Sequence, residues 1–311
     1  MLEIKRRHFF RNQEHFYIPG KPFWGLFLIW LLACVLALFG LGDIALRDFD
    51  EATVARVAYE ISNQKGVEQF LPTIWGADYI NKPPGLHLLI AGVINLSRNV
   101  FFQAENLPSE FVVRLAPALL STLVVPIGGL IQWHLRPKEP LSSLATAGIL
   151  LTLLPIARHG RLAMLDGPQL SAMALLWLIL VSIDTSRLDK IRALFAGVVS
   201  SFLLLMKAPF LIPALLAGLI PIFLSKKIQH LSIGPLVGFF VVGLLPGITW
   251  HIWHWIERGQ NALWLWGGDG ATRVLLEAGE GSDLGFLVPI IETLEGGWPW
   301  LLLWPVGLVW A

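Results

Sequence analysis

Long apolar runs recur along this chain and constrain its fold more than any other feature. A helical bilayer crossing needs about 20 mostly apolar residues, within a range of about 17–25. The first run, Phe23–Leu41, is longer than the apolar region of about 7–15 residues in a signal peptide, so we expect an uncleaved anchor. Further candidate spans cover residues 112–134, 140–157, 168–184, 190–206, 208–225 and 231–252, and one more begins near Pro299.

The composition agrees with a membrane bundle. The chain is 55% hydrophobic and only 14% charged, whereas soluble domains average about 45–50% and about 25%. We therefore predict an all-α fold, a polytopic bundle of membrane helices. No long basic run accompanies the net charge of +1, which argues against a nucleic-acid partner. Cys34 is the only cysteine, which excludes an intrachain disulfide and a cysteine-based metal site.

The distribution of positive charge predicts the topology. Residues 1–22 are basic, which places them in the cytoplasm. Clustered Lys and Arg also mark three later connections, at 136–138, 187–192 and 226–227. The remaining connections, together with the polar stretch Leu46–Leu88, then face outside. This parity requires that Gly85–Leu96 does not cross fully, so we expect a re-entrant or interfacial helix there, with a full crossing as the rival topology.

A short amphipathic helix is predicted within this first outer loop. The helix lies on the outer membrane surface in this interpretation. Arg56 and Glu60 form an i, i+4 pair on its polar side. Its apolar face has the i, i+3, i+4, i+7 spacing and consists of Val54, Val57, Ala58 and Ile61.

Two adjacent carboxylates, Asp50 and Glu51, open this helix. They are candidates for acid–base chemistry at a membrane surface. A structural alternative is equally open from the pattern alone. In it Asp48 caps the helix, Glu51 closes a capping box and Asp50 only interacts with the helix dipole.

A second acidic position, Asp166, directly precedes an apolar run in Leu165-Asp166-Gly167-Pro168. An aspartate N-cap followed by a first-turn proline would explain it without any chemistry. Arg158, His159 and Arg161 stand close by on a side where positive charge is normally sparse. An anionic substrate would explain that cluster.

Three cations on the same predicted side could hold a phosphate. Lys207 interrupts an apolar stretch too long for one crossing, so it belongs in an outer turn, with a snorkelling lysine as the alternative. Lys82 precedes Pro83-Pro84, which restrict its backbone, and it can be incidental to a helix start. A lysine binds phosphate as a point charge. Arg273 ends a Gly-rich loop over 264–273, which is weak evidence for phosphate binding.

Taken in order, these motifs resemble those of the GT-C superfamily of membrane glycosyltransferases. The resemblance is strongest to the branch of the lipid A aminoarabinose transferases and protein O-mannosyltransferases. It covers residues 23–311. We expect this segment to be a catalytic module that is truncated at its C-terminus. The matching motifs are Asp50-Glu51-Ala52, Lys82-Pro83-Pro84, Leu165-Asp166-Gly167-Pro168, Met206-Lys207, and Arg273 with Trp298-Pro299-Trp300.

The resemblance implies transfer of a sugar from a polyprenyl-phosphate donor to a lipid or protein acceptor. The protein would be a multi-pass protein of a bacterial-type plasma membrane, surrounded by membrane lipids, with its active site on the outer face. The implied catalytic residues are Asp50, with Glu51 and Asp166. The implied ligands of the donor phosphate are Lys82, Lys207 and Arg273.

Several positions depart from the family pattern. Val54 stands where relatives often carry a tyrosine, and Asn81 stands where they carry an acid. In the aminoarabinose branch a histidine lies a few residues before the loop arginine, whereas this chain has Gly268-Asp269-Gly270 in that place. We therefore assign no cofactor and no metal ligands, and a divalent metal stays open. The alternatives to an enzyme are a non-catalytic polyprenyl-phosphate-binding or assembly protein and, less favoured, a transporter, whose polar residues normally lie near the bilayer midplane.

Overall fold

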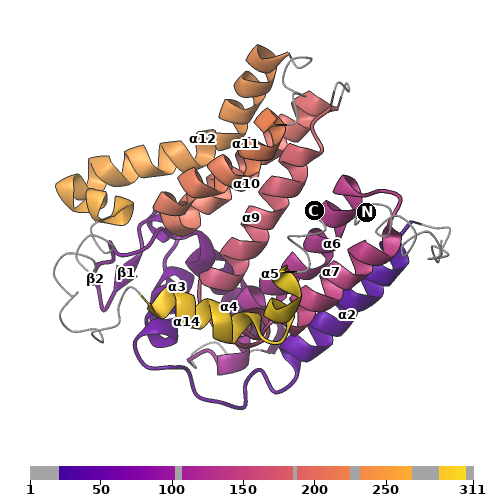
Figure 1. Ribbon diagram of the computed structural model, residues 1–311. Coiled ribbons are helices and arrows are strands. Elements are labelled where there is room, and N and C mark those ends of the chain that lie inside the picture. The colour runs from indigo at the N-terminus through magenta and orange to yellow at the C-terminus, as the bar shows by residue number, and fades with distance from the viewer. Residues whose placement is uncertain (1–20, 102–106, 185–187, 225–231, 268–286, 306–311) are drawn as a thin grey trace, which may run out of the picture.

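The computed structural model shows a bundle of helices with two short strands at one edge (Figure 1). The structure describes residues 21–101, 107–184, 188–224, 232–267 and 287–305. Within them, strands occur only as a two-stranded antiparallel hairpin. The predicted all-α class is confirmed.

The elements divide into a bundle and the segments that cover its end. The first half of the bundle consists of α2 (Phe23–Leu38), α5 (Glu110–Thr122), α6 (Val124–Leu135), α7 (Pro140–Thr152) and α8 (Leu154–His159). The second half consists of α9 (Asp166–Val181), α10 (Asp189–Lys207), η2 (Ala208–Phe210), α11 (Leu211–Leu224) and α12 (Ile233–Arg258). The remaining segments are α3 (Asp50–Asn63), η1 (Gly66–Phe70), β1 (Thr73–Ile74), β2 (Ala77–Asp78), α4 (Gly85–Phe101), η4 (Gly259–Trp266), α14 (Val288–Gly297) and η5 (Trp300–Leu303).

Three helical stretches are long and apolar enough to cross a membrane, Glu110–Leu135, Asp189–Ile220 and Ile233–Ala262. Shorter apolar helices cover Phe23–Leu38, Pro140–Thr152 and Asp166–Val181. The chain is thus an integral membrane protein.

The expected span over 140–157 is not one continuous helix. Leu153 adopts an extended conformation between α7 and α8. Pro155 stands in the first turn of α8, where a missing backbone N–H is tolerated, whereas inside a continuous helix it would remove a hydrogen bond. The apolar run is therefore interrupted at Leu153.

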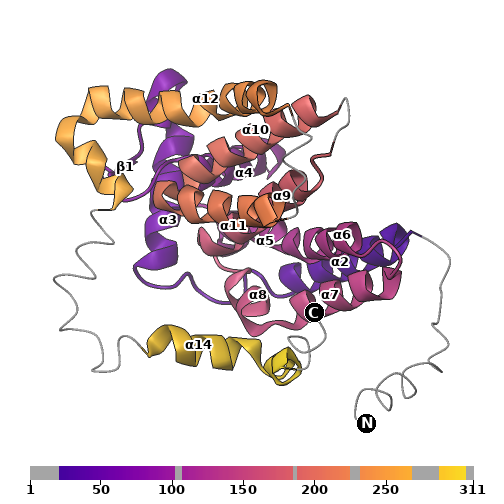
Figure 2. The same ribbon diagram turned by 45° about the horizontal axis from the view of Figure 1, so that its top comes forward.

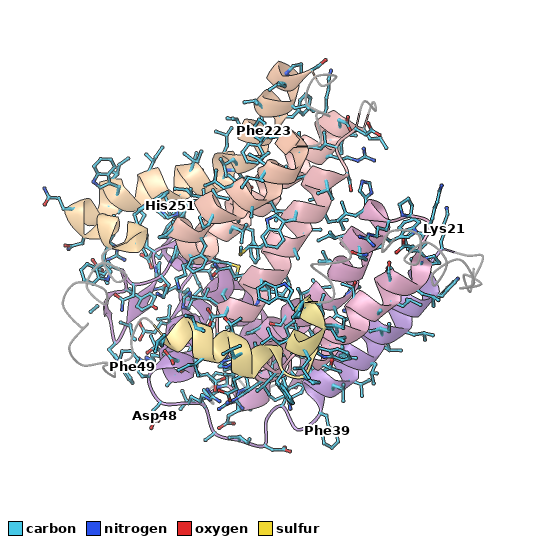
Figure 3. All side chains as sticks on the ribbon, viewed as in Figure 1. Lys21, Phe39, Asp48, Phe49, Phe223 and His251 are labelled. Atoms are coloured by element: carbon cyan, nitrogen blue, oxygen red, sulfur yellow. The ribbon has the colours of Figure 1, made fainter. Side chains whose placement is uncertain are left out.

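Contacts at both ends of α2 show that it runs antiparallel to the α5–α6 pair. Phe23 and Trp133 meet edge to face with ring centroids 5.1 Å apart. At the other end, Arg114 Nη1 donates to the Leu41 carbonyl at 3.1 Å. Lys21 and Phe39 accordingly lie at the two ends of α2 (Figure 3). The basic connection after α6 shares the end of Lys21, as the charge pattern predicts.

Small residues let α10 and α12 approach closely in a parallel arrangement. A Cβ atom on Gly243 would meet the Leu194 carbonyl oxygen at 2.2 Å, and one on Gly197 would meet the Phe240 carbonyl oxygen at 2.1 Å. Further along both helices, His251 Nε2 lies 3.2 Å from the Leu204 carbonyl. Because α10 and α12 run in the same direction, α11 between them in sequence must return, which agrees with the predicted alternation.

The short helix in the first loop forms as expected. The four residues of its predicted apolar face, Val54, Val57, Ala58 and Ile61, are buried. Arg56 Nε contacts Glu60 Oε1 at 2.7 Å. Phe49 precedes the helix with a φ of 68° and provides no side-chain cap, so the capping box of Asp48 and Glu51 is not formed.

The helix α4 is packed inside the protein along one face. Leu86, His87, Ile90 and Ile94 have no more than 1% of their surface exposed. Its 17 residues extend roughly 25 Å at about 1.5 Å per residue, short of a hydrocarbon core about 30 Å thick. Since α2 and α9 are no longer than α4, with 16 residues each, the re-entrant or interfacial helix and the rival full crossing both stay predictions.

The close crossing of α10 and α12 yields a stability prediction. We expect Gly243→Ala to lower stability by about 1–3 kcal/mol, because the added methyl group must push two backbones apart. Gly238→Ala, on the same helix with no atom within 4 Å of its Cβ position, is the matched control. Thermal unfolding followed by size-exclusion chromatography compares the two variants; equal midpoints would contradict the close packing.

Candidate active site

A buried ion pair forms the centre of the candidate site. Arg114 Nε donates to Glu51 Oε1 at 2.8 Å, and Arg114 Nη2 donates to Glu51 Oε2 at 2.7 Å. The Arg114 and Glu51 side chains are only 5% and 0% exposed. This two-point geometry is the strongest form of arginine–carboxylate pairing.

The rest of the Arg114 guanidinium holds the start of the first loop. Its Nη1 donates to the carbonyl groups of Leu41 and Ile44 at 3.1 and 2.6 Å. Its Nη2 donates to the Ala45 carbonyl at 3.0 Å. All five N–H groups of an arginine are thereby used, and the loop between α2 and α3 is wrapped around this one side chain.

Glu51 also joins the first loop to the loop that precedes α9. Its Oε1 accepts a hydrogen bond from the Ala163 backbone N–H at 2.7 Å, and its Oε2 accepts one from the Arg47 N–H at 3.0 Å. Burial alone would raise the pKa of the Glu51 carboxyl, but the bonds from Arg114, Ala163 and Arg47 outweigh it, so this pKa lies below its usual value. Glu51 is therefore a charged connector between two loops.

Contact between α4 and α10 brings the segment of Lys82, before α4, close to the segment of Lys207, at the end of α10. A Cβ atom on Gly85 would meet the Leu205 carbonyl oxygen at 2.6 Å, so only glycine allows this approach. Lys82 stands three residues before Gly85, and Lys207 stands two residues after Leu205. His87 Nδ1, 3.2 Å from the Pro83 carbonyl, ties the turn of Lys82 to α4.

One hydrophobic cluster underlies four of the five described candidates for chemistry. It contains Val54, Leu86, Leu165 and Met206 among its buried members. Each of these cluster residues stands within four positions of one candidate residue in the sequence. The candidates, in the same order, are Asp50, Lys82, Asp166 and Lys207. Segments far apart in the sequence thus meet over a common core.

Exposure separates the candidates into accessible and inaccessible groups. Asp50 and Asp166 are exposed, and Lys82 and Lys207 are half-buried. Glu51 has no exposed surface, so its carboxylate faces the protein. The catalytic role of Glu51 stays a prediction, and its burial favours a positioning role instead. Arg273 lies outside the described residues.

Asp166 begins α9 but does not cap it. Leu165 occupies the N-cap position, without a side-chain cap bond. The Asp166 side chain instead lines a cavity of about 500 Å³ together with Arg158, His159 and Glu295. The basic cluster predicted around Asp166 is therefore partly gathered in space. Arg161 is used differently, since its guanidinium donates to the Ala37 and Phe39 carbonyl groups.

Sequence analysis missed Arg114, although a usable signal was present. The residue stands inside the apolar run 112–134, where an ionisable side chain normally has a specific partner. Glu60 was expected only as the partner of Arg56, yet it also accepts bonds from Thr73 Oγ1 and the Trp75 N–H, both at 2.6 Å. It thereby holds the β1–β2 hairpin against α3.

Among the described residues, no group of three or more His, Cys, Asp and Glu side chains is placed to hold a metal ion. His251 and His254 are buried among aromatic rings, with His254 stacked on Trp250 at 4.7 Å between centroids. Both histidines are part of the packing between α12, α10 and η4.

Comparison with known proteins supports the fold but not a family assignment by sequence. No family model matches the chain, and no curated protein matches it. A solved structure with a similar fold is that of ArnT from Cupriavidus metallidurans, bound to undecaprenyl phosphate, with a TM-score of 0.68 at 17% identity. The match covers 90% of this chain and 50% of that one. The chain thus has the fold of that ArnT structure and spans about half of its length.

The buried ion pair predicts an asymmetric mutational response. We expect Arg114→Met to cost about 3–5 kcal/mol, because it leaves the Glu51 carboxylate buried without its partner. The double variant Glu51→Gln/Arg114→Met should lose less than the sum of the two single changes. Arg136→Gln is the control, since its pair with Glu139 is 3.7 Å long and half exposed, and such pairs are worth about 0–1 kcal/mol. Additive losses in chemical unfolding would refute the coupling.

The lowered pKa of Glu51 predicts acid sensitivity. A carboxyl whose pKa is lower in the folded state stabilises the fold above its ordinary pKa of 4.5. That contribution is lost as the pH falls through the lowered value. Melting temperatures between pH 7 and pH 3 should therefore fall more steeply for the unmodified protein than for Glu51→Gln. The exposed Glu139→Gln should keep the full slope, and identical slopes for all three proteins would contradict the assignment.

Proposed function

We propose that the protein is a glycosyltransferase that moves a sugar from a polyprenyl-phosphate donor to a lipid or protein acceptor. The observation that supports this most is the shared core beneath Asp50, Lys82, Asp166 and Lys207. Four buried residues of this core each stand within four positions of one of these two exposed carboxylates and two half-buried lysines. The ArnT structure of similar fold contains undecaprenyl phosphate.

In this proposal the lysines bind the donor phosphate. As the bond from the sugar C1 atom to the phosphate oxygen breaks, negative charge grows on the leaving phosphate. Lys82 and Lys207 oppose that charge at a partly dehydrated membrane surface, where electrostatic stabilisation is stronger than in water. Arg273 is proposed as a third phosphate ligand from the resemblance alone.

The carboxylates act on the acceptor side. Asp50 accepts the proton from the acceptor nucleophile as its new bond to C1 forms, and general-base assistance of this kind contributes about 10²–10⁴-fold. Asp166 orients the acceptor from the cavity that it lines. Glu51 supports Asp50 indirectly, because its bonds to Arg114 and Ala163 fix the first turn of α3.

A non-catalytic polyprenyl-phosphate-binding protein is the second candidate. Asn81 favours it, because this exposed amide stands directly before Lys82 where the resembled enzymes carry an acid. Such a protein would bind the lipid phosphate through the same lysines without turnover.

Two variants separate the proposals. Asp50→Asn should keep binding of undecaprenyl phosphate but lower sugar transfer about 10²–10⁴-fold, because only the proton acceptor is lost. Lys82→Gln should weaken both. The assay uses purified protein in nanodiscs, undecaprenyl phosphate carrying a radiolabelled sugar, and a membrane lipid extract as acceptor.

The exposed neighbour Asp48 provides the control, since Asp48→Asn should behave as the unmodified protein. Transfer by Asp50→Asn at the normal rate would remove Asp50 from the mechanism. Binding without any turnover by the unmodified protein would favour the second candidate.

A further inference from the structure

Two neighbouring cavities open next to the loop that precedes α9. The first is the cavity of about 500 Å³ lined by Asp166. The second, of about 240 Å³, lies where α2, α5 and α8 meet. Ser121, Ile156 and Gly160 line both cavities, so the two adjoin and can hold parts of one ligand.

The lining of the first cavity is mainly apolar but carries four ionisable side chains, two acidic and two basic, and for these side chains we call it the polar cavity. Asp166 and Glu295 bring hydrogen-bond acceptors, and Arg158 and His159 bring donors. The helix α14, which carries Glu295, lies alongside α8 (Figure 2). Mixed carboxylates and N–H donors suit a group rich in hydroxyls, which both donates and accepts hydrogen bonds.

The second cavity is an apolar crevice. Small side chains such as Ala37 and Ala118 line it, and Leu36, 51% exposed, stands at its edge. Arg161 is the one charged side chain among the described residues that line it, and its guanidinium already donates to the Ala37 and Phe39 carbonyl groups. Such a crevice at the surface of a membrane helix suits a hydrocarbon chain.

We propose that the two cavities together bind the acceptor, and that this acceptor is a lipid with a hydroxyl-bearing headgroup. The headgroup occupies the polar cavity and one chain occupies the apolar crevice. This inference rests on the proposed function and decides between the lipid and protein acceptors that it leaves open, because a protein acceptor has no hydrocarbon chain for the crevice.

The location of the donor residues supports this division. Neither Lys82 nor Lys207 lines either cavity. The polar cavity belongs instead to the loop that Glu51 joins to α3 through the Ala163 N–H. A headgroup beside Asp166 is therefore on the side of the proposed base, Asp50, and the donor phosphate approaches from the α4–α10 side.

Photolabelling in nanodiscs tests the site on the complete chain. The probe is a glycolipid with a diazirine in its acyl chain, compared with a phosphatidylcholine that carries the same chain. The glycolipid should label the segment 154–161 about tenfold more than the phosphatidylcholine, which corresponds to about 1.4 kcal/mol of preference. Equal labelling by the two lipids would mean ordinary boundary lipid and would overturn the proposal.

A matched pair of variants tests the crevice itself. Ala157 and Ala145 are both exposed alanines on adjacent helices, but only Ala157 lines the crevice. We expect Ala157→Trp to lower glycolipid labelling about tenfold and Ala145→Trp to leave it unchanged, with the same elution volume for both. Equal labelling of these two variants would overturn the chain's placement in the crevice.

Competition experiments distinguish the other occupants. Displacement of the glycolipid by undecaprenyl phosphate would assign the cavities to the donor, and displacement by a water-soluble serine peptide would assign them to a protein acceptor; either result overturns the proposal. Binding of undecaprenyl phosphate to Lys82→Gln is measured separately. If Lys82→Gln binds undecaprenyl phosphate as tightly as the unmodified protein, that result counts against the proposed function. The photolabelling result can still be interpreted by itself.

Discussion

The ion pair of Glu51 and Arg114 is the interaction on which the rest of this end of the molecule depends. Taking two charges out of water is costly unless the remaining hydrogen-bonding groups are also satisfied. Here the guanidinium donates five hydrogen bonds and the carboxylate accepts four. These bonds tie the end of α2, the start of α3, the helix α5 and the loop before α9 to one point. The loop between α2 and α3 and the loop before α9 would otherwise be independent, and both are therefore held to α5 at this point.

These bonds explain how exposed residues can be positioned for chemistry. Asp50 directly precedes Glu51, so its backbone is fixed by the buried neighbour, while its own side chain stays accessible. It also lies at the N-terminus of α3, where the helix dipole favours a negative charge. The lysine turns are positioned differently, through the contact of Gly85 with the Leu205 backbone. Precise placement of surface groups thus comes from a buried ion pair on one side and a glycine contact on the other.

Two parts of the candidate site differ in the chemistry that they offer. Toward α4 and α10 are the half-buried lysines, which suit a phosphate. Toward α8, α9 and α14 are a polar cavity and its apolar extension, which suit a lipid with a hydroxyl-bearing headgroup. A transfer reaction needs a donor and an acceptor that approach one point from different directions. The proposed function and the proposed acceptor site are consistent with this arrangement.

Hydrophobic periodicity and charge by themselves determined the membrane bundle and the amphipathic helix of the first loop, because these depend on local patterns that any bilayer protein must satisfy. The side of the membrane on which each connection lies stays a prediction from the charge pattern. The sequence also predicted Asp50, Asp166, Lys82 and Lys207 as candidates. It could not distinguish the role of Glu51 from that of Asp50, since adjacent carboxylates look alike until one is buried. Only the tertiary structure decided this, by bringing Arg114, 63 positions away, against Glu51. The break at Leu153 and the two adjoining cavities likewise arise from packing between distant segments, which no local pattern encodes.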